Sequence, residues 1–166
     1  MIIGCVLLSL FLSNFEIKIP KKYQRIINKE MAVSPFSSDN QELKNSVQTL
    51  FLLHVNPNKI SDLIAEAYKN TPKKWQEEIF YLLSSKIKDK EQEKEYLMEE
   101  LNSDILESLY DSQVWQKINA LSFEDKLPYL LHHILGWNNE KIGNLLTISI
   151  SEVEILLVKI LKKLSK

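Results

Sequence analysis

Glycine and proline are scarce in this chain of 166 residues, which has only three glycines and five prolines. A β-sandwich or β-barrel needs turn residues roughly every ten positions, so this shortage argues against both classes. Leucine, isoleucine, lysine and glutamate are abundant instead, and hydrophobic residues make up 45% of the chain, enough to fill a core. The sequence therefore predicts an all-α protein.

Cysteine and arginine are each represented by a single residue, Cys5 and Arg25. A single cysteine forms no internal disulfide, which fits a reducing compartment, and we expect a cytoplasmic protein. Lysine carries nearly all of the positive charge, and the net charge of -1 gives no general attraction to polyanions. Any contact with nucleic acid therefore has to come from a local cluster of cations.

Motifs that carry catalysis or bind metals are missing. The sequence has no glycine-rich phosphate loop and no Gly-x-Ser-x-Gly element. His132 and His133 are adjacent and point about 100° apart on a helix, whereas a shared metal needs a spacing of four residues. His54 has no partner at ligand spacing, and Cys5 has no neighbour that would lower its pKa. We expect a protein that is not an enzyme and that uses neither a metal nor a cofactor.

Residues 1–13 form an apolar run with no basic residue ahead of it. A secretory signal has such a basic start, and a membrane span needs about 20 apolar residues, so the run fits neither. We expect a helix that docks on the core, and we do not expect a membrane partner. Two alternatives stay open. One is a lipid anchor at Cys5, because residues 2–5 look like a lipoprotein lipobox, and the other is a true start at Met31.

Helical periodicity divides the rest of the chain. Residues 15–30 are the most basic window, which is either a solvated helix face or a surface for phosphate or a membrane. We expect residues 1–40 to be an N-terminal segment and linker, followed by a helical domain, a charged connector and a second helical domain at residues 41–90, 91–112 and 113–166. The prediction is of two small helical bundles joined by the charged connector.

The last 31 residues carry the clearest local signals. Asn138 and Asn139 are candidate helix N-caps, and the following apolar face is interrupted at Thr147. Ser149 and Glu152 have the spacing of a capping box, after which apolar residues recur at helical spacing. These signals predict a helix-turn-helix.

The order of helices and three local patterns resemble the sigma-70 family of bacterial transcription initiation factors, in particular the small extracytoplasmic-function group. Residues 62–68, DLIAEAY, are similar to the acidic helix with which the family holds the polymerase, and residues 117–136 look like the helices that lead into its fourth region. Residues 142–153 resemble its helix-turn-helix. The resemblance implies binding to the RNA polymerase core through Asp62, Glu66 and Tyr68, and regulation by an anti-sigma protein.

The resemblance also implies binding to double-stranded DNA by the second helix of the helix-turn-helix. The residues expected to face DNA are Ser151, Ile155, Lys159, Lys162, Lys163 and Lys166. The chain departs from the family at Thr147, where the family usually has glycine, and at residues 154–156, where it commonly has Lys, Ser and Arg. Because Glu154 repels phosphates and Ile155 cannot donate to guanine, we expect weak, salt-sensitive and poorly selective binding.

Two other functions stay open. The chain could be an adaptor that uses Ile155, Val158 and residues 86–100 to bind another protein, because exposed apolar residues on a recognition helix favour such a partner. It could also be a regulator tethered to a membrane by residues 1–13. Melting of promoter DNA is not favoured, because Trp75, Phe80 and Tyr81 are spaced as core residues.

Overall fold

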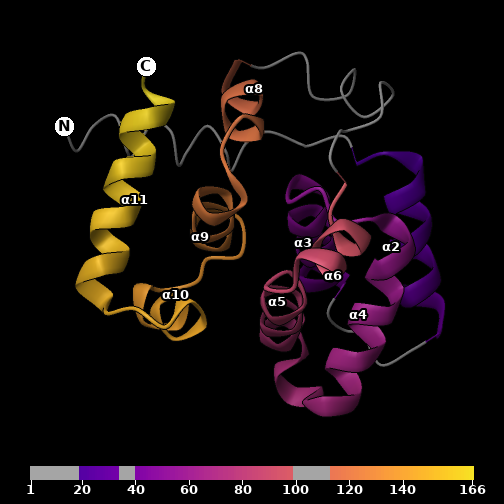
Figure 1. The fold of residues 1–166 in the computed structure, drawn as a ribbon. Helices are drawn as coiled ribbons and strands as arrows, with labels where there is room; N and C mark the ends of the chain where they lie inside the picture. The colour runs from indigo at the N-terminus through magenta and orange to yellow at the C-terminus, as the bar shows by residue number, and fades with distance from the viewer. Residues whose placement is uncertain (1–18, 34–39, 99–112) are drawn as a thin grey trace. The chain divides into compact units, whose positions relative to one another are not determined.

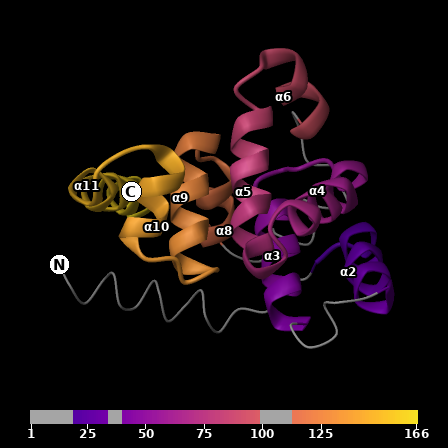
Figure 2. The same cartoon turned by 90° about the horizontal axis from the view of Figure 1, so that it is seen from below.

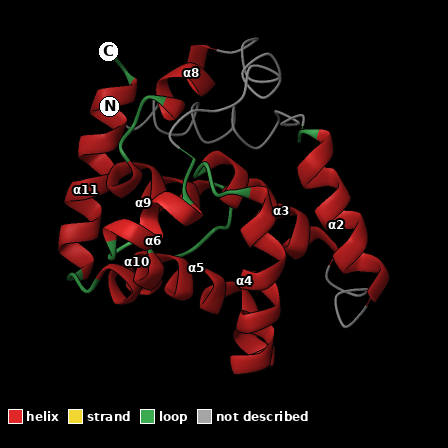
Figure 3. Cartoon of the chain, turned by 45° about the vertical axis from the view of Figure 1, so that its right-hand side comes forward, coloured by secondary structure: helices red, strands yellow, loops and turns green. Residues whose placement is uncertain are grey.

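The computed structural model describes residues 19–33, 40–98 and 113–166. Within these ranges the regular structure is helical, as Figure 1 and Figure 3 show. The one exception in these ranges is an isolated bridge between Val55 and Leu97. The prediction of an all-α protein is confirmed. The chain divides into two compact units. We call residues 19–33 and 40–98 the N-terminal unit and residues 113–166 the C-terminal unit.

The N-terminal unit contains a short 3-10 helix, η2 (Pro72–Lys74), and the α-helices α2 (Lys21–Val33), α3 (Asn40–Leu52), α4 (Pro57–Asn70), α5 (Trp75–Lys86) and α6 (Lys90–Tyr96). Helices α2 to α5 each contribute fully buried apolar side chains at helical spacing, which form one core: Tyr23, Ile27, Leu43, Val47, Leu50, Phe51, Ile60, Leu63, Ile64, Ala67, Ile79, Phe80 and Leu83.

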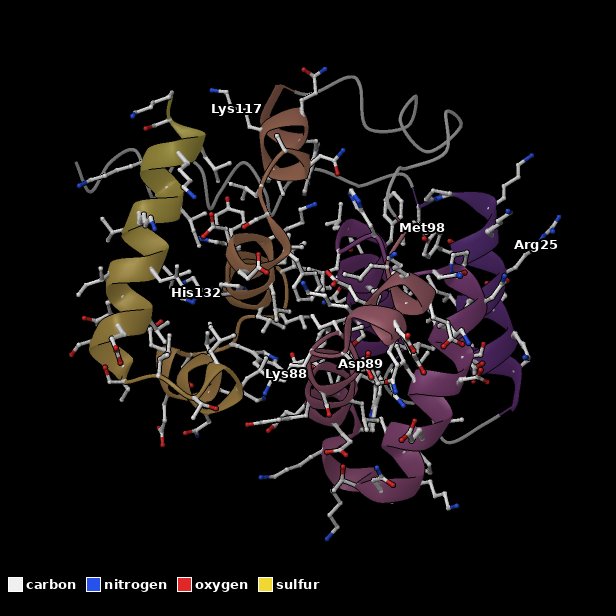
Figure 4. The ribbon with its side chains drawn as sticks, viewed as in Figure 1. Arg25, Lys88, Asp89, Met98, Lys117 and His132 are labelled. Atoms are coloured by element: carbon white, nitrogen blue, oxygen red, sulfur yellow. The ribbon has the colours of Figure 1, made fainter. Side chains whose placement is uncertain are left out.

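Helix α2 belongs to this core, although the sequence placed residues 1–40 in a separate segment. The Tyr23 ring lies 4.9 Å from that of Phe51, and its hydroxyl donates a 2.9 Å hydrogen bond to the carbonyl of Val55. Burial raises the pKa of Tyr23, so this donor stays protonated. The helix continues through Met31 without a break. The basic residues of α2 are all exposed, namely Lys21, Lys22, Arg25 and Lys29, and Figure 4 labels Arg25.

Two turns in the N-terminal unit depend on proline. Asn56 caps α4 by accepting a 3.0 Å hydrogen bond from the backbone N–H of Asn58, with Pro57 at the first helical position. Thr71 precedes η2, which begins at Pro72, and the Thr71 side chain makes no capping hydrogen bond. The α-helix proper therefore begins at Trp75.

Helix α6 is hydrogen-bonded to the rest of the N-terminal unit, although most of it lies in the range that was predicted to be a charged connector, residues 91–112. The backbone N–H of Met98 donates to the carbonyl of His54 at 2.9 Å, and that of Asn56 donates to the carbonyl of Tyr96 at 2.8 Å. The ammonium groups of Lys59 and Lys86 lie 5.5 and 5.4 Å from the centre of the Tyr96 ring. The rest of the predicted connector, residues 99–112, lies outside the described residues.

The C-terminal unit consists of α8 (Gln113–Asn119), α9 (Phe123–His133), α10 (Asn139–Leu146) and α11 (Ile150–Leu164). Ser122 caps α9 by accepting a 3.4 Å hydrogen bond from the N–H of Asp125. The Asp125 carboxylate does not return this bond but pairs with Lys163 of α11. Pro128 lies inside the helix, beyond its first turn.

Helix α9 carries ionisable groups into the core of the C-terminal unit. Asp125 and Lys126 are 8% and 4% exposed. Burial lowers the pKa of Lys126 to about 8, although its ammonium donates a 3.1 Å hydrogen bond to the carbonyl of Asn119. Burial and the neighbouring His132 lower the pKa of His133 to about 4, and its ring lies 4.4 Å from that of Tyr129.

The expectations for residues 1–13, and for the linker at residues 34–39, lie outside the described residues. Across the described ranges, no helix combines the length and the apolar character needed to cross a membrane.

Candidate nucleic-acid interface

Helix α10 begins at a well-formed cap. The Asn138 side chain accepts a 2.8 Å hydrogen bond from the N–H of Lys141, as the sequence predicted. Just before it, Gly136 has a positive φ of 66°, a conformation that glycine adopts without strain. The ammonium of Lys141 lies 4.6 Å from the centre of the Trp137 ring. These contacts fix the start of the first helix of the predicted helix-turn-helix.

The turn between α10 and α11 contains a residue in the left-handed conformation. Thr147 adopts φ 60° and ψ 44°, which strains the backbone at a β-branched residue. The N–H groups of Thr147 and Ile148 both point to the carbonyl of Gly143, the latter at 3.0 Å, which is the pattern of a Schellman-type cap.

Gly143 allows the turn to lie close against α10. A Cβ atom at this position would be 2.7 Å from the carbonyl oxygen of Ile148, closer than a side-chain carbon can approach. Sequence reasoning did not single out Gly143, because a glycine inside a helical pattern says nothing by itself about which backbone approaches it.

Helix α11 starts with the predicted capping box. Glu152 accepts hydrogen bonds from the N–H and the hydroxyl of Ser149 at 2.8 and 2.7 Å, and its own N–H donates to the Ser149 hydroxyl oxygen at 3.2 Å. These hydrogen bonds from Ser149 hold the pKa of Glu152 below its usual value. Figure 1 shows α10 nearly along its axis and α11 from the side, and Figure 2 shows α11 nearly along its axis. The two helices therefore cross steeply, as in a helix-turn-helix.

One side of α11 packs into the C-terminal unit. This inner stripe consists of four buried residues at helical spacing, Val153, Leu157, Ile160 and Leu164. At the end of the helix, Lys117 of α8 donates a 3.1 Å hydrogen bond to the carbonyl of Leu164, and Figure 4 shows Lys117 on α8 near this end. The ion pair between Lys163 and Asp125 of α9 is a second polar contact that holds α11 in place. The orientation of α11 is therefore fixed by apolar and polar contacts together.

The opposite side of α11 is open to solvent. This outer face consists of Ser151, Ile155, Val158, Lys159 and Lys162, continued by Lys166. Ile155 and Val158 are 68% and 47% exposed, which is unusual for apolar side chains of their size. Every outer-face residue except Ser151 lines a shallow, open depression. In the described part of the chain, the three lysines of this face form no ion pair.

Lys163 stands apart from the other residues predicted to contact DNA. Its side chain is 48% exposed, but its ammonium is held by Asp125, whose side chain is 12% exposed. A largely buried carboxylate without this cation would be costly, so Lys163 stabilises the fold. The structure thus brings five of the six predicted residues together on the outer face and gives the sixth an internal partner.

The residues predicted to bind polymerase do not form one surface. Asp62 is exposed, and Glu66 lies one turn further along α4 on the same side. Glu66 is engaged by Lys86 of α5 at 3.3 Å. Tyr68 is half-buried and lies about 200° around the helix from Glu66. A partner that contacted Asp62 and Glu66 would therefore not reach Tyr68 across the same helix face.

Other sites considered from the sequence find little support in the geometry. Among the described residues, no group of three or more His, Cys, Asp or Glu side chains is arranged to hold a metal ion. His132 instead makes a 3.0 Å hydrogen bond through Nδ1 to the carbonyl of Trp137. Trp75 and Phe80 are buried, as their spacing predicted, whereas Tyr81 is 39% exposed.

Comparison of the chain with protein-family models, with curated proteins and with solved structures found no match.

Proposed function

We propose that this protein binds double-stranded DNA through the outer face of α11 and acts in bacterial transcription, in the manner of the sigma-70 family that its sequence resembles. The observation that carries the proposal is the steep helix pair α10 and α11, joined by the left-handed turn at Thr147, with the outer face left open. A helix held this way enters the major groove of DNA with its first turns. Lys159, Lys162 and Lys166 then lie where phosphates flank the groove.

Salt dependence of DNA binding tests this proposal. Fluorescence anisotropy with a random-sequence duplex is expected to show binding at low salt that falls steeply as salt rises, because each phosphate contact releases a counterion. Replacing Lys159, Lys162 and Lys166 with Gln should weaken binding and reduce the slope of log affinity against log salt by about two to three.

A charge-matched control separates this face from charge in general. Lys73, Lys90 and Lys94 are exposed lysines of the N-terminal unit, and replacing them with Gln changes the net charge by the same amount. We expect their loss to leave the slope nearly unchanged. Absence of binding at low salt, or an equal loss in the control, would contradict the proposal.

The role in transcription predicts a complex with the RNA polymerase core. Size-exclusion chromatography of the full chain with purified bacterial core enzyme should show co-elution. Because Asp62 is exposed and forms no ion pair within the described residues, whereas Glu66 is held by Lys86, we expect Asp62→Asn to weaken this complex more than Glu66→Gln. Co-elution that neither substitution weakens would show that the polymerase contact does not lie on this side of α4.

An adaptor is the second candidate, and one observation favours it. Ile155 and Val158 expose apolar surface on a helix that is otherwise well packed. A protein partner would bury this surface without needing DNA. DNA binding that survives replacement of the three outer-face lysines, or that is missing altogether, would favour the adaptor.

A further inference from the structure

The outer face of α11 divides into two chemically different halves. Its first turns present Ser151, Ile155 and Val158, which carry no charge, whereas its last turns present lysines. Ile155 lies nearly opposite the inner stripe, and among the described residues it is the most exposed large apolar side chain. In a helix-turn-helix the first turns of the second helix meet the base edges. The neutral half of the outer face is therefore the half that would read the bases.

The side chains available in this half restrict which bases they can recognise. Guanine is usually read by arginine or lysine and adenine by asparagine or glutamine, and residues 150–158, the first turns of α11, contain none of these four. Glu154 is exposed beside this half and accepts hydrogen bonds only, and Ser151 discriminates little. The one base-edge group that matches an exposed isoleucine or valine is the C5-methyl group of thymine.

We propose that Ile155, with Val158 beside it, contacts thymine methyl groups in the major groove, so that the protein prefers A·T-rich duplexes. This inference rests on the proposed DNA-binding function and gives that function a substrate class. The charge of the same face supports DNA as the partner. Lys159, Lys162 and Lys166 follow the apolar half along the outer face, where a bound duplex would place its phosphates. Selectivity comes from the apolar half and affinity from the cationic half.

Replacing thymine with uracil tests the contact directly, since uracil keeps every base pair and removes only the methyl group. Anisotropy is measured with an A·T-rich duplex and with its uracil counterpart at the same salt concentration. The wild-type chain should bind the uracil duplex about fourfold more weakly for each methyl group contacted. A G·C duplex in which cytosine is replaced by 5-methylcytosine should in turn bind more tightly than the unmodified one.

Three variants separate the methyl contact from general binding. Replacing both Ile155 and Val158 with Ser should make the chain bind the thymine and uracil duplexes equally, and Ile155→Ser alone should remove part of the difference. Lys162→Gln should weaken binding to both duplexes by the same factor and leave their ratio unchanged. Ile155 and Val158 are 68% and 47% exposed, so these changes leave the fold intact, which circular dichroism checks.

The outcomes distinguish this inference from the proposed function. Salt-sensitive binding with equal affinity for the two duplexes would overturn the methyl contact and leave DNA binding in place. A preference for thymine that persists when both Ile155 and Val158 are replaced with Ser would also overturn it, because the preference would then reflect DNA shape. Absence of binding to either duplex at low salt would overturn both and assign the apolar half to a protein partner.

Discussion

The two units place their charges in opposite ways. In the N-terminal unit, the buried polar residues are the neutral Ser46 and Thr49, whose hydroxyls donate 2.8 Å hydrogen bonds to helix carbonyls. Charged residues there lie nearer the surface, and two ion pairs link its helices. Lys59 pairs with Glu95, and this hydrogen bond raises the pKa of the lysine; Lys86 pairs with Glu66.

In the C-terminal unit some charges are buried, and three lysines of the outer face form no ion pair within the described residues. Asp125, Lys126 and the half-buried His133 are taken into the core, where Asp125 pairs with Lys163. Burying ionisable groups reduces stability unless they are well paired, and surface charge without a partner adds none. The comparison indicates that the C-terminal unit, unlike the N-terminal unit, buries charged groups, while the outer face of α11 leaves charge available to a partner.

Acid should therefore affect the C-terminal unit first, which is the largest effect that we expect. The pKa of His133 is about 4 when folded and 6.5 when unfolded, so the unfolded state binds more protons between these values. The stability contributed by neutral His133 is complete above pH 6.5 and is lost as the pH falls towards 4. Between pH 7 and pH 5 this amounts to about 2 kcal/mol. His133→Phe, which keeps a ring against Tyr129, should remove this loss.

Tryptophan fluorescence during urea denaturation reports on this difference. Trp75 lies in the N-terminal unit, whereas Trp115 and Trp137 lie in the C-terminal unit. Two chains are compared, Trp75→Phe alone and Trp75→Phe combined with His133→Phe. Between pH 7 and pH 5, the urea midpoint of the chain that keeps His133 should fall by more than that of the other chain. An equal fall in both chains would remove His133 as the cause.

The turn at Thr147 should yield a smaller effect of the opposite sign. A non-glycine residue at positive φ costs about 1–2 kcal/mol, and glycine relieves this cost while gaining disorder in the unfolded chain. Thr147→Gly should therefore stabilise the C-terminal unit by about 1 kcal/mol, seen as a higher thermal midpoint. Thr71, with φ -143°, is the matched control, and Thr71→Gly should destabilise the protein. Losses of similar size at both positions would mean that Thr147 is unstrained.

The surface ion pairs should give the smallest effect. Glu66→Gln breaks the 3.3 Å pair with Lys86 and should destabilise the N-terminal unit by less than about 1 kcal/mol, since exposed pairs contribute little. Lys162→Gln breaks no ion pair within the described residues and should leave stability unchanged to within about 0.5 kcal/mol. Urea denaturation of the two variants makes the comparison. A larger loss from Lys162→Gln would reverse the contrast between the units.

Features that depend on neighbours in sequence could be predicted. The caps at Asn138 and Ser149, the inner stripe of α11 and the interruption at Thr147 each involve residues within four positions of one another, where helix geometry alone fixes the relation. The exposure of Ser151 and Ile155 follows from the same periodicity, which is why most of the candidate interface was found.

Features that depend on distant partners could not be predicted. Asp125 has the spacing of a capping box with Ser122, yet its carboxylate pairs with Lys163, 38 residues away. Lys59 similarly forms an ion pair with Glu95, 36 residues away, and this pair attaches α6 to α4 in a region where a charged connector was expected. Periodicity says which side of a helix is polar, but it does not say which other helix lies opposite.

The close contact between Gly143 and Ile148 restricts which side chains the turn between α10 and α11 can accept. One hydrogen atom in place of a methyl group lets two backbones touch, and so determines the angle at which α11 leaves α10. Widening that angle would swing the far end of a helix of 15 residues through many times the displacement at the turn. The direction in which the outer face points thus depends on a glycine at a buried position in α10.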